Sequence, residues 1–442
     1  MIMAEKKVKV GLVGFGTVGC GVAKLINEEA DSIAARTGIR LELARVVDVD
    51  TTTERPVKLA DGVLTDDISS ILDDESISIG VELVGGTGAA KDIQLKLLES
   101  GKDVVTANKA LLAEHGSELY EAAHNNGRCI AFEASCAGGI PIVSAIRTGL
   151  AANNITAMYG IVNGTCNYIL SNMTSQDEDF SEALAQAQAK GFAESDPTLD
   201  INGGDSAHKL AILASIAMGY EISLDDIFVE GIEGVSKDDI RFGGEMNYVL
   251  KLLAICQKDE DGRISLRVHP SFIARDNHLA LVDGPFNAIS IFGSAVGQVL
   301  YYGRGAGMMP TASAVVADII EVAMGNSARI FDHLNLKPRR EISGLIDNID
   351  NLVSRFYIRF MAKDQPGVFA QIGRLLSENQ ISISGVLQRE GRGKDNTVPL
   401  VITTHETLQS KVSSCLAGLA KLDTILTEPV CIRIVDIPED KD

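Results

Sequence analysis

Hydrophobic residues in the first 135 positions form short continuous runs that alternate with stretches of helical periodicity. The continuous runs predict strands, at residues 8–13, 41–47, 79–84, 103–106 and 128–134. Between them, apolar residues recur at the three- and four-residue spacing of amphipathic helices, at 18–26, 89–100 and 109–126. Strands alternating with helices are typical of a parallel α/β sheet, so we predict one such domain over residues 1–135.

The alternation becomes less regular after residue 135. Strand-like runs lie at 155–162, 265–268 and 288–293, and a helix that is apolar on every side spans 206–219. This pattern predicts an α+β domain over residues 136–304. A second apolar helix, at 311–324, follows a glycine-rich segment. We expect residues 305–340 to return to the first domain and complete it.

The end of the chain has a third pattern. We predict a linker over 341–354 and a separate domain over 355–442. In this last domain, strands and helices follow one another as strand 355–361, helix 368–379, strand 382–389, strand 398–403, helix 407–419 and strand 430–435. The order βαββαβ is that of a ferredoxin-like fold.

Charge and composition exclude several classes of protein. The 442 residues contain 40 Lys and Arg against 60 Asp and Glu, a net charge of −20, which argues against nucleic-acid partners and anionic lipid surfaces. No apolar window reaches the length of about 18 residues that a membrane span needs. The first strand leaves no room for a signal peptide. Seven scattered cysteines without a Cys-x-x-Cys pair favour a reducing, cytoplasmic location.

A glycine motif connects the first strand to the first helix. Its residues are Gly14, Phe15, Gly16, Thr17, Val18 and Gly19. In this context, the glycines allow a tight turn and a close approach of the backbone to a pyrophosphate, which the helix N-terminus also attracts. The alternative is a turn that is merely rich in glycine. The motif predicts a Rossmann-type site for NAD or NADP.

Carboxylates at the end of the second strand bear on the choice of cofactor. Asp48, or Asp50 beside it, can accept hydrogen bonds from the ribose hydroxyls of NAD and repel the 2′-phosphate of NADP. Arg55 and Lys58 follow closely and could offset that repulsion. We favour NAD and leave NADP or dual use open. The alternative for Asp48 is a solvated strand end.

Two lysines are candidates for proton chemistry. Lys109 follows a predicted strand, at the edge where open α/β sheets bind ligands. Lys209 opens the apolar helix four residues after Asp205, and a partly desolvated lysine suits proton transfer near neutral pH. The alternatives are a solvated lysine for Lys109 and, for Lys209, an ion pair with a capping aspartate. Glu194, in a turn-rich loop, could hold a substrate amine.

These features together resemble the homoserine dehydrogenase family. The matching segments lie in the family's order and are Gly14–Gly19, Asn108-Lys109, 163–170 (Asn-Gly-Thr-Cys-Asn-Tyr-Ile-Leu), 194–197 (Glu-Ser-Asp-Pro) and 205–209, from Asp205 to Lys209. The resemblance implies NAD(P)-dependent oxidation of L-homoserine to L-aspartate 4-semialdehyde, or the reverse. It also implies a role in the biosynthesis of threonine, methionine and isoleucine.

The resemblance also implies roles for individual residues. Lys209 would exchange a proton with the substrate oxygen, and Asp205 would orient it and contact substrate. Glu194 would bind the substrate amino group, with Thr165 beside the substrate and Lys109 at both nicotinamide and substrate. Thr87 and Gly305 match cofactor contacts. A loop similar to the family's cation site would hold Na⁺ through Glu133 and the carbonyls of Cys136, Gly138 and Ile140; the alternative is an ordinary glycine turn.

The segment from Ala362 to Ile372 resembles the start of an ACT domain. That family binds amino acids at paired domains, which implies feedback control, here by L-threonine, and a homodimer or homotetramer. Asp364 and Gly367 lie where such ligands bind. The alternative is a domain that only mediates contacts between subunits.

Other functions remain open at this point. One is an NAD-bound amino-acid sensor without catalysis, and another is a related dehydrogenase of a different small polar substrate. The presence of Lys109, Glu194, Asp205 and Lys209 favours an enzyme, because a sensor needs no residue to move a proton.

Overall fold

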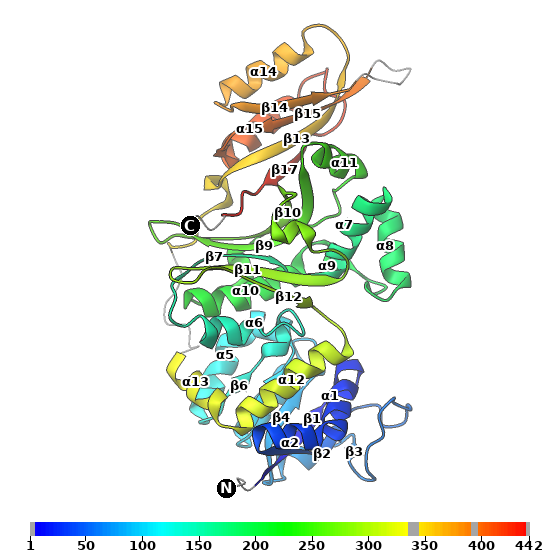
Figure 1. Ribbon diagram of the computed structural model, residues 1–442, viewed down its shortest axis with the longest axis vertical. Coiled ribbons are helices and arrows are strands. Elements are labelled where there is room, and N and C mark those ends of the chain that lie inside the picture. Colours follow the sequence, from blue (N-terminus) through cyan, green and yellow to red (C-terminus); the bar gives the residue numbers. More distant parts are fainter. Residues whose placement is uncertain (1–4, 335–343, 390–396, 439–442) are drawn as a thin grey trace. The chain divides into compact units, whose positions relative to one another are not determined.

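The computed structural model describes residues 5–334, 344–389 and 397–438. The chain forms two compact units, each assembled from separate segments. The first unit comprises Met1–Ile155, His208–Asp226 and Gly293–Ser343, and the second comprises Thr156–Ala207, Ile227–Phe292 and Gly344–Asp442. Figure 1 shows the course of the chain through both units, which are described in turn.

The first unit contains a six-stranded parallel sheet in the order β3-β2-β1-β4-β5-β6. Its strands are β1 (Lys6–Val13), β2 (Ile39–Val47), β3 (Leu64–Thr65), β4 (Ile77–Glu82), β5 (Asp103–Thr106) and β6 (Ile130–Ala131). All six strands are parallel, but the chain adds β2 and β3 on one side of β1 and then β4, β5 and β6 on its other side. Doubly wound sheets bind ligands beyond the strand ends at such a switch point, here between β1 and β4. The predicted α/β class is therefore confirmed.

Most helices of the first unit come from its first and its last sequence segments. They are α1 (Thr17–Glu28), α2 (Ala30–Thr37), α3 (Ser69–Leu72), α4 (Ala89–Glu99), α5 (Lys109–Asn125), α6 (Ile142–Ser144), α12 (Met308–Ala323) and α13 (Asn326–Leu334), with a π-helical turn at Ala145–Gly149 and an added strand, β12 (Gly297–Arg304). The late helix α12 lies beside α1 (Figure 1). Gly21 permits this contact, because a Cβ there would lie 2.9 Å from the Met308 carbonyl oxygen.

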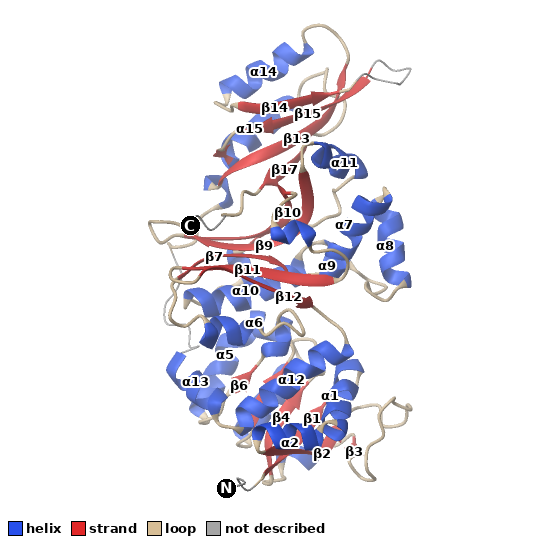
Figure 2. Cartoon of the chain, viewed as in Figure 1, coloured by secondary structure: helices blue, strands red, loops and turns tan. Residues whose placement is uncertain are grey.

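The second unit is built on a mixed sheet whose strands run in the order β11-β7-β9-β10-β17-β13-β15-β14. The strands that precede the ACT segment are β7 (Ile155–Ile161), β8 (Phe228–Val229), β9 (Tyr248–Lys258), β10 (Ile264–Ala274) and β11 (Phe286–Gly293). The helices are α7 (Gly164–Gln176), α8 (Phe180–Ala189), α9 (Thr198–Ile201) and α11 (Lys237–Glu245), together with the first residues of α10 (Gly204–Met218), which from His208 onward belongs to the first unit. Figure 2 distinguishes the strands from the helices.

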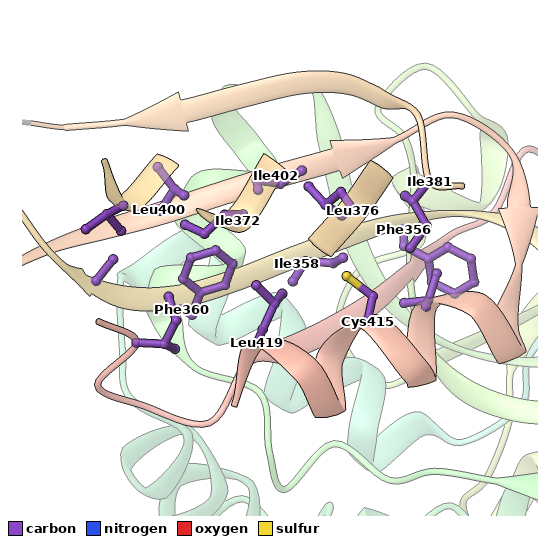
Figure 3. Packing of buried hydrophobic residues seen from close by; sticks show 14 residues of the cluster. Phe356, Ile358, Phe360, Ile372, Leu376, Ile381, Leu400, Ile402, Cys415 and Leu419 are labelled. Carbon is purple, nitrogen blue, oxygen red and sulfur yellow. The ribbon is translucent and has the colours of Figure 1, made fainter. Parts of the chain in front are cut away.

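The C-terminal segment has the predicted βαββαβ order. It contains β13 (Val353–Lys363), α14 (Val368–Glu378), β14 (Ile383–Gln388), β15 (Thr397–Thr404), β16 (Thr407–Leu408), α15 (Gln409–Leu419) and β17 (Val430–Ile434). Alternate residues of β13, namely Phe356, Ile358 and Phe360, point toward Ile372 and Leu419 of the helices (Figure 3). This buried cluster is the core that the alternating pattern of the strands encodes.

The C-terminal segment belongs to the second compact unit together with earlier parts of the chain. Strand β17 pairs with β10, with Ser271 opposite Arg433 and Phe272 opposite Ile434. Upstream, the Ile264 amide donates to the Leu345 carbonyl over 2.7 Å, inside the predicted linker. Because both strand edges are satisfied by this pairing, the two sheets become one. The predicted 136–304 domain is divided between the two units.

No helix in the described part of the chain is long and apolar enough to cross a membrane. All seven cysteines are free thiols, and all except the half-buried Cys431 are buried.

Candidate active site

The glycine motif forms the turn between β1 and α1, and each glycine has a distinct physical reason. Gly14 has φ +98°, and a Cβ there would lie 2.7 Å from the Leu83 carbonyl group. A Cβ on Gly19 would lie 2.1 Å from the Gly14 carbonyl oxygen. Gly16, in contrast, has no atom within 4 Å of that position, which leaves room above the helix N-terminus. The loop therefore fits a pyrophosphate at the dipole end of α1.

Asp48 lies just beyond β2 and is held by the glycine loop. Its Oδ2 accepts a hydrogen bond from the Phe15 amide at 2.6 Å, and its Oδ1 accepts one from the Asp50 amide at 2.9 Å. The Arg55 guanidinium donates to the Phe15 carbonyl and lies 3.9 Å from Asp48 and 3.4 Å from Asp50. Hydrogen bonds from Thr53 and Thr52 hold the pKa of Asp50 well below its usual value. Two carboxylates thus flank this arginine.

A buried carboxylate that the motifs did not reveal organises the next loop. Glu82 ends β4 with no exposed surface and accepts hydrogen bonds from the Val84 and Gly85 amides, at 2.7 and 3.3 Å. Its other oxygen accepts from Gln94 and Thr106. Asn108 donates to the Gly86 carbonyl over 2.7 Å and caps α5. These bonds fix the loop that contains Thr87. The sequence feature that could have indicated this role is a glutamate at the end of an apolar strand.

The two candidate lysines lie near one thiol. Lys109 is the first residue of α5, and Lys209 lies on α10 with 8% of its surface exposed. The Cys136 sulfur lies 3.9 Å from the Lys209 carbonyl oxygen. Burial raises the pKa of the Cys136 thiol to about 12, while the charges of Lys209 and Lys109 oppose that rise. The charges of two lysines 100 positions apart in the sequence thus act on the same thiol.

The predicted cation loop contacts the late glycine-rich segment. Gly138 adopts φ +54°, and a Cβ there would lie 2.5 Å from the Gly305 carbonyl oxygen. Glu133 is buried, and its carboxylate accepts hydrogen bonds from the Val143 and Ser144 amides at 2.8 Å and from the Ser144 hydroxyl. The Glu133 amide donates to Asp318 at 2.7 Å. No cluster of three or more His, Cys, Asp and Glu side chains suited to a metal occurs among the described residues.

The candidate substrate residues of the second unit surround the start of α7. Asn163 donates to Asp200 and to the buried Asp205, both over 2.7 Å, and it also caps α7. The Thr165 hydroxyl donates to the Phe192 carbonyl over 2.6 Å and so holds the loop that follows α8. Glu194 is exposed on that loop. Asp205 shares α10 with Lys209, four residues apart and therefore on one face of the helix.

The candidate regulatory residues lie between β13 and α14. Asp364 and Gly367 are both exposed, and Gly367 caps the helix with φ +92°. Only glycine adopts this conformation without strain, so the turn explains why glycine occurs there.

Three family models match the chain along nearly its whole length. Residues 14–133 match the NAD binding domain of homoserine dehydrogenase, residues 141–320 match homoserine dehydrogenase itself, and residues 356–419 match the ACT domain. A homoserine dehydrogenase of Pseudomonas aeruginosa is 41% identical over 435 residues, which cover 97% of this chain and 99% of the relative.

The chain belongs to the homoserine dehydrogenase family. The relative from Helicobacter pylori is 42% identical over 438 residues, with 97% of this chain and 99% of the relative covered. The crystal structure of a homoserine dehydrogenase from Thiobacillus denitrificans has a TM-score of 0.88 at 38% identity and covers 98% of this chain and 99% of that one. A hyperthermophilic archaeal homoserine dehydrogenase mutant, solved in complex with NADPH, has a TM-score of 0.60 at 27% identity; the match covers 72% of this chain and 98% of that one.

Homoserine dehydrogenases are NAD(P)-dependent oxidoreductases that act on a CH–OH group, and this activity is that of the present chain. The predicted family, fold class and cofactor type are confirmed, and the ACT domain is consistent with regulation.

Proposed function

We propose that Lys209 moves the proton in the reversible oxidation of L-homoserine to L-aspartate 4-semialdehyde. The observation that carries this proposal is the pair of lysines beside Cys136, one of them 8% exposed, in the unit that also forms the cofactor loop. A buried lysine can take the proton of a substrate hydroxyl as the neutral amine and return it as the ammonium form. NAD or NADP, when bound, accepts the hydride from the alcohol carbon.

The remaining polar residues serve binding and orientation in this proposal. Asp205 orients Lys209 from one turn earlier on α10, and its bond to Asn163 fixes its rotamer. Glu194 binds the substrate ammonium group, and Thr165 supports the Glu194 loop through its bond to Phe192. Lys109, at the end of β5, carries a positive charge to the substrate and nicotinamide.

NAD is the cofactor that we favour. Asp48 and Asp50 flank Arg55, so much of the charge that would attract a 2′-phosphate is already balanced. Kinetics with both cofactors test this preference. We expect Asp48→Ser to shift the ratio of kcat/KM values toward NADP, because it removes a carboxylate and releases Arg55. An unchanged ratio would contradict the role of Asp48.

We also propose a Na⁺ site in the loop from Glu133 to Ile140. Its ligands are Glu133 and the carbonyl oxygens of Cys136, Gly138 and Ile140, which suit a hard cation. Because the Glu133 carboxylate already accepts three hydrogen bonds, the carbonyl oxygens supply most of the coordination. Activity measured in Na⁺ against a bulky organic cation tests this site.

For the ACT domain we propose threonine binding near Asp364 and Gly367, in a homodimer or homotetramer. We place the enzyme in the cytoplasm, which the free cysteines support. Removing the domain would expose the edge of β10, so a point variant of the full chain is the better test. Asp364→Ala should weaken threonine inhibition and leave kcat unchanged. Equal inhibition of both proteins would contradict the site.

The proton-transfer role is tested with Lys209→Met and the matched control Lys96→Met, an exposed lysine on α4. We expect kcat for L-homoserine to fall about 10²–10⁴-fold in Lys209→Met, the range for loss of a general acid–base group. Cofactor binding should be retained, and the control should match the wild type. Near-normal turnover would disprove the assignment, whereas absence of turnover in the wild type would favour a cofactor-bound sensor.

A further inference from the structure

The first unit contains a cavity of about 340 Å³ that the dehydrogenase chemistry does not use. It lies between α5, the segment that follows α6, and the C-terminal half of α10 with the loop after it. All residues that line it belong to this unit. None of the proposed substrate, cofactor, cation or regulatory residues is among them. Its volume is within the usual range for small-molecule sites.

Most of the cavity wall is apolar. Leu112 comes from α5, Ile146 and Leu150 from the segment after α6, and Ile212 from α10, and all four are buried. Such a wall suits the hydrocarbon part of a small molecule, which gains free energy when it leaves water. The carboxylates Glu114 and Glu221 also line the cavity but are exposed, so solvent screens their repulsion of an anion.

Arg147 is the charged residue in the buried part of the wall. It is 6% exposed, and its Nε has no hydrogen-bond partner among the described residues. A buried polar atom without a hydrogen-bond partner is costly, and folded proteins rarely retain one. Arg147 also lies in a π-helical turn, a rare conformation that often occurs at functional sites.

Tyr120 adds a hydroxyl group to the same cavity. Burial raises the pKa of this phenol well above its usual value, so the hydroxyl is a hydrogen-bond donor at any physiological pH. Arg147 lines the same cavity, and its charge opposes the rise. A guanidinium and a hydroxyl donor in one largely apolar cavity match a carboxylate group.

We propose that this cavity binds a small carboxylate with an apolar body, paired with the guanidinium of Arg147. The helices on either side are α5 and α10, which begin near Lys109 and Lys209. Binding itself does not depend on the roles proposed for those lysines, so failure of one proposal leaves the other standing.

Calorimetric titration of the full chain tests the proposal with a matched pair of probes. The probes are 4-methylpentanoate and its amide, which have the same apolar body but differ in charge. We expect the carboxylate to bind at least about tenfold more tightly than the amide, a difference of 1.4 kcal/mol. Equal affinities, or no binding of the carboxylate at millimolar concentration, would overturn the proposal. This comparison uses only the wild-type protein.

Two substitutions then locate the site. Arg147→Met should lower carboxylate affinity at least about tenfold and leave amide affinity unchanged. Ala217→Phe should lower the affinity for both probes, because it fills the cavity from α10. Arg36→Met, an exposed arginine on α2, is the control and should bind as the wild type does. Normal carboxylate binding by a folded Arg147→Met protein would assign the ligand to another place.

Discussion

Two arginines in this chain, one buried and one with 13% of its side chain exposed, have opposite surroundings. Arg359, on β13, donates to Asp239 through Nε at 2.5 Å and through a second nitrogen at 3.0 Å, and it also bonds Ser236. Tyr357 donates to the same carboxylate over 3.1 Å. Arg147, in the cavity of the first unit, has an unpaired Nε. The first guanidinium is paired with a carboxylate, whereas the Nε of the second has no hydrogen-bond partner among the described residues.

The difference separates a structural role from a binding role. Asp239 has no exposed surface and belongs to α11, so its pairing with Arg359 ties the ACT segment to the preceding part of the second unit. A second pair, Arg433 with Glu230 at 2.8 Å, lies along the same junction. The strand pairing of β10 with β17 continues this connection. In the part of the chain that the structure describes, no carboxylate bonds the Nε of Arg147, which is consistent with a site for an external one.

Breaking the pair at the junction is expected to have a large effect on stability. Asp239→Ala leaves the Arg359 guanidinium buried beside Tyr357 without its counter-ion. We expect a loss of about 3–5 kcal/mol in the free energy of unfolding of the second unit. Urea denaturation measures it, and Asp238→Ala, the exposed neighbour, is the control. A loss no greater than that of the control would mean that Arg359 does not depend on this carboxylate.

A double variant distinguishes charge from packing at the same place. Asp239→Leu with Arg359→Met replaces both charged groups by apolar ones, which in other buried ion pairs is neutral or stabilising. We therefore expect the double variant to recover at least about 2 kcal/mol relative to Asp239→Ala. If the double variant is as unstable as the single one, the carboxylate contributes through Ser236 and the helix cap rather than through Arg359.

The sequence predicted those features that depend on local patterns. The strand that became β1 and the six main elements of the ACT segment were found because their apolar residues are continuous or periodic. Helix α2 was missed since only Ile33 of its residues is buried, which leaves no apolar stripe. Strand β9 was missed because Lys251 interrupts its apolar run, although this lysine is 1% exposed and donates to Asn167 and the Val282 carbonyl.

Contacts between distant residues could not be predicted in the same way. Glycine spacing indicated the cofactor loop, but nothing in the sequence indicated that Asp48 bonds the Phe15 amide. The pairing of Asp239 with Arg359 joins residues 120 positions apart, and the pairing of β10 with β17 places Ser271 opposite Arg433. Tertiary packing determines such partners. In a single sequence, each of them looks like any other polar residue.

A pH measurement asks whether Asp318 is a concealed partner of Arg147. Burial raises the pKa of Asp318 to about 8, and Glu133 adds to the rise while Arg147 opposes it. Above pH 3.8, the ordinary pKa of this carboxyl, the unfolded state has released the proton, whereas the folded state keeps it up to about pH 8. Stability should fall as pH rises from about 4 to about 8, by at most about 1.4 kcal/mol per pH unit, and then level off.

Asp318→Asn should remove this part of the pH dependence while retaining an acceptor for the Glu133 amide. The variant should gain stability relative to the wild type between pH 5 and about pH 8.5, as thermal unfolding at both values would measure. An ion pair with Arg147 would give the opposite sign, because the pKa of the carboxyl would then lie below its ordinary value. If the variant is instead less stable than the wild type at high pH, Asp318 is a carboxylate partner of Arg147. The two arginines would then no longer differ in this respect.

The smallest expected effect is the stability change in Arg147→Met. Without a hydrogen bond at Nε to lose, and with a linear apolar side chain in its place, the variant should unfold within about 1 kcal/mol of the wild type. Arg359→Met, in contrast, leaves the Asp239 carboxylate buried and should be destabilised by about 3–5 kcal/mol. Added 4-methylpentanoate should raise the unfolding temperature of the wild type and of Arg359→Met, since a ligand stabilises the state that binds it, but should not raise that of Arg147→Met. If Arg147→Met is as unstable as Arg359→Met, then Arg147 is a structural residue as well, and the unpaired nitrogen is not the mark of a ligand site.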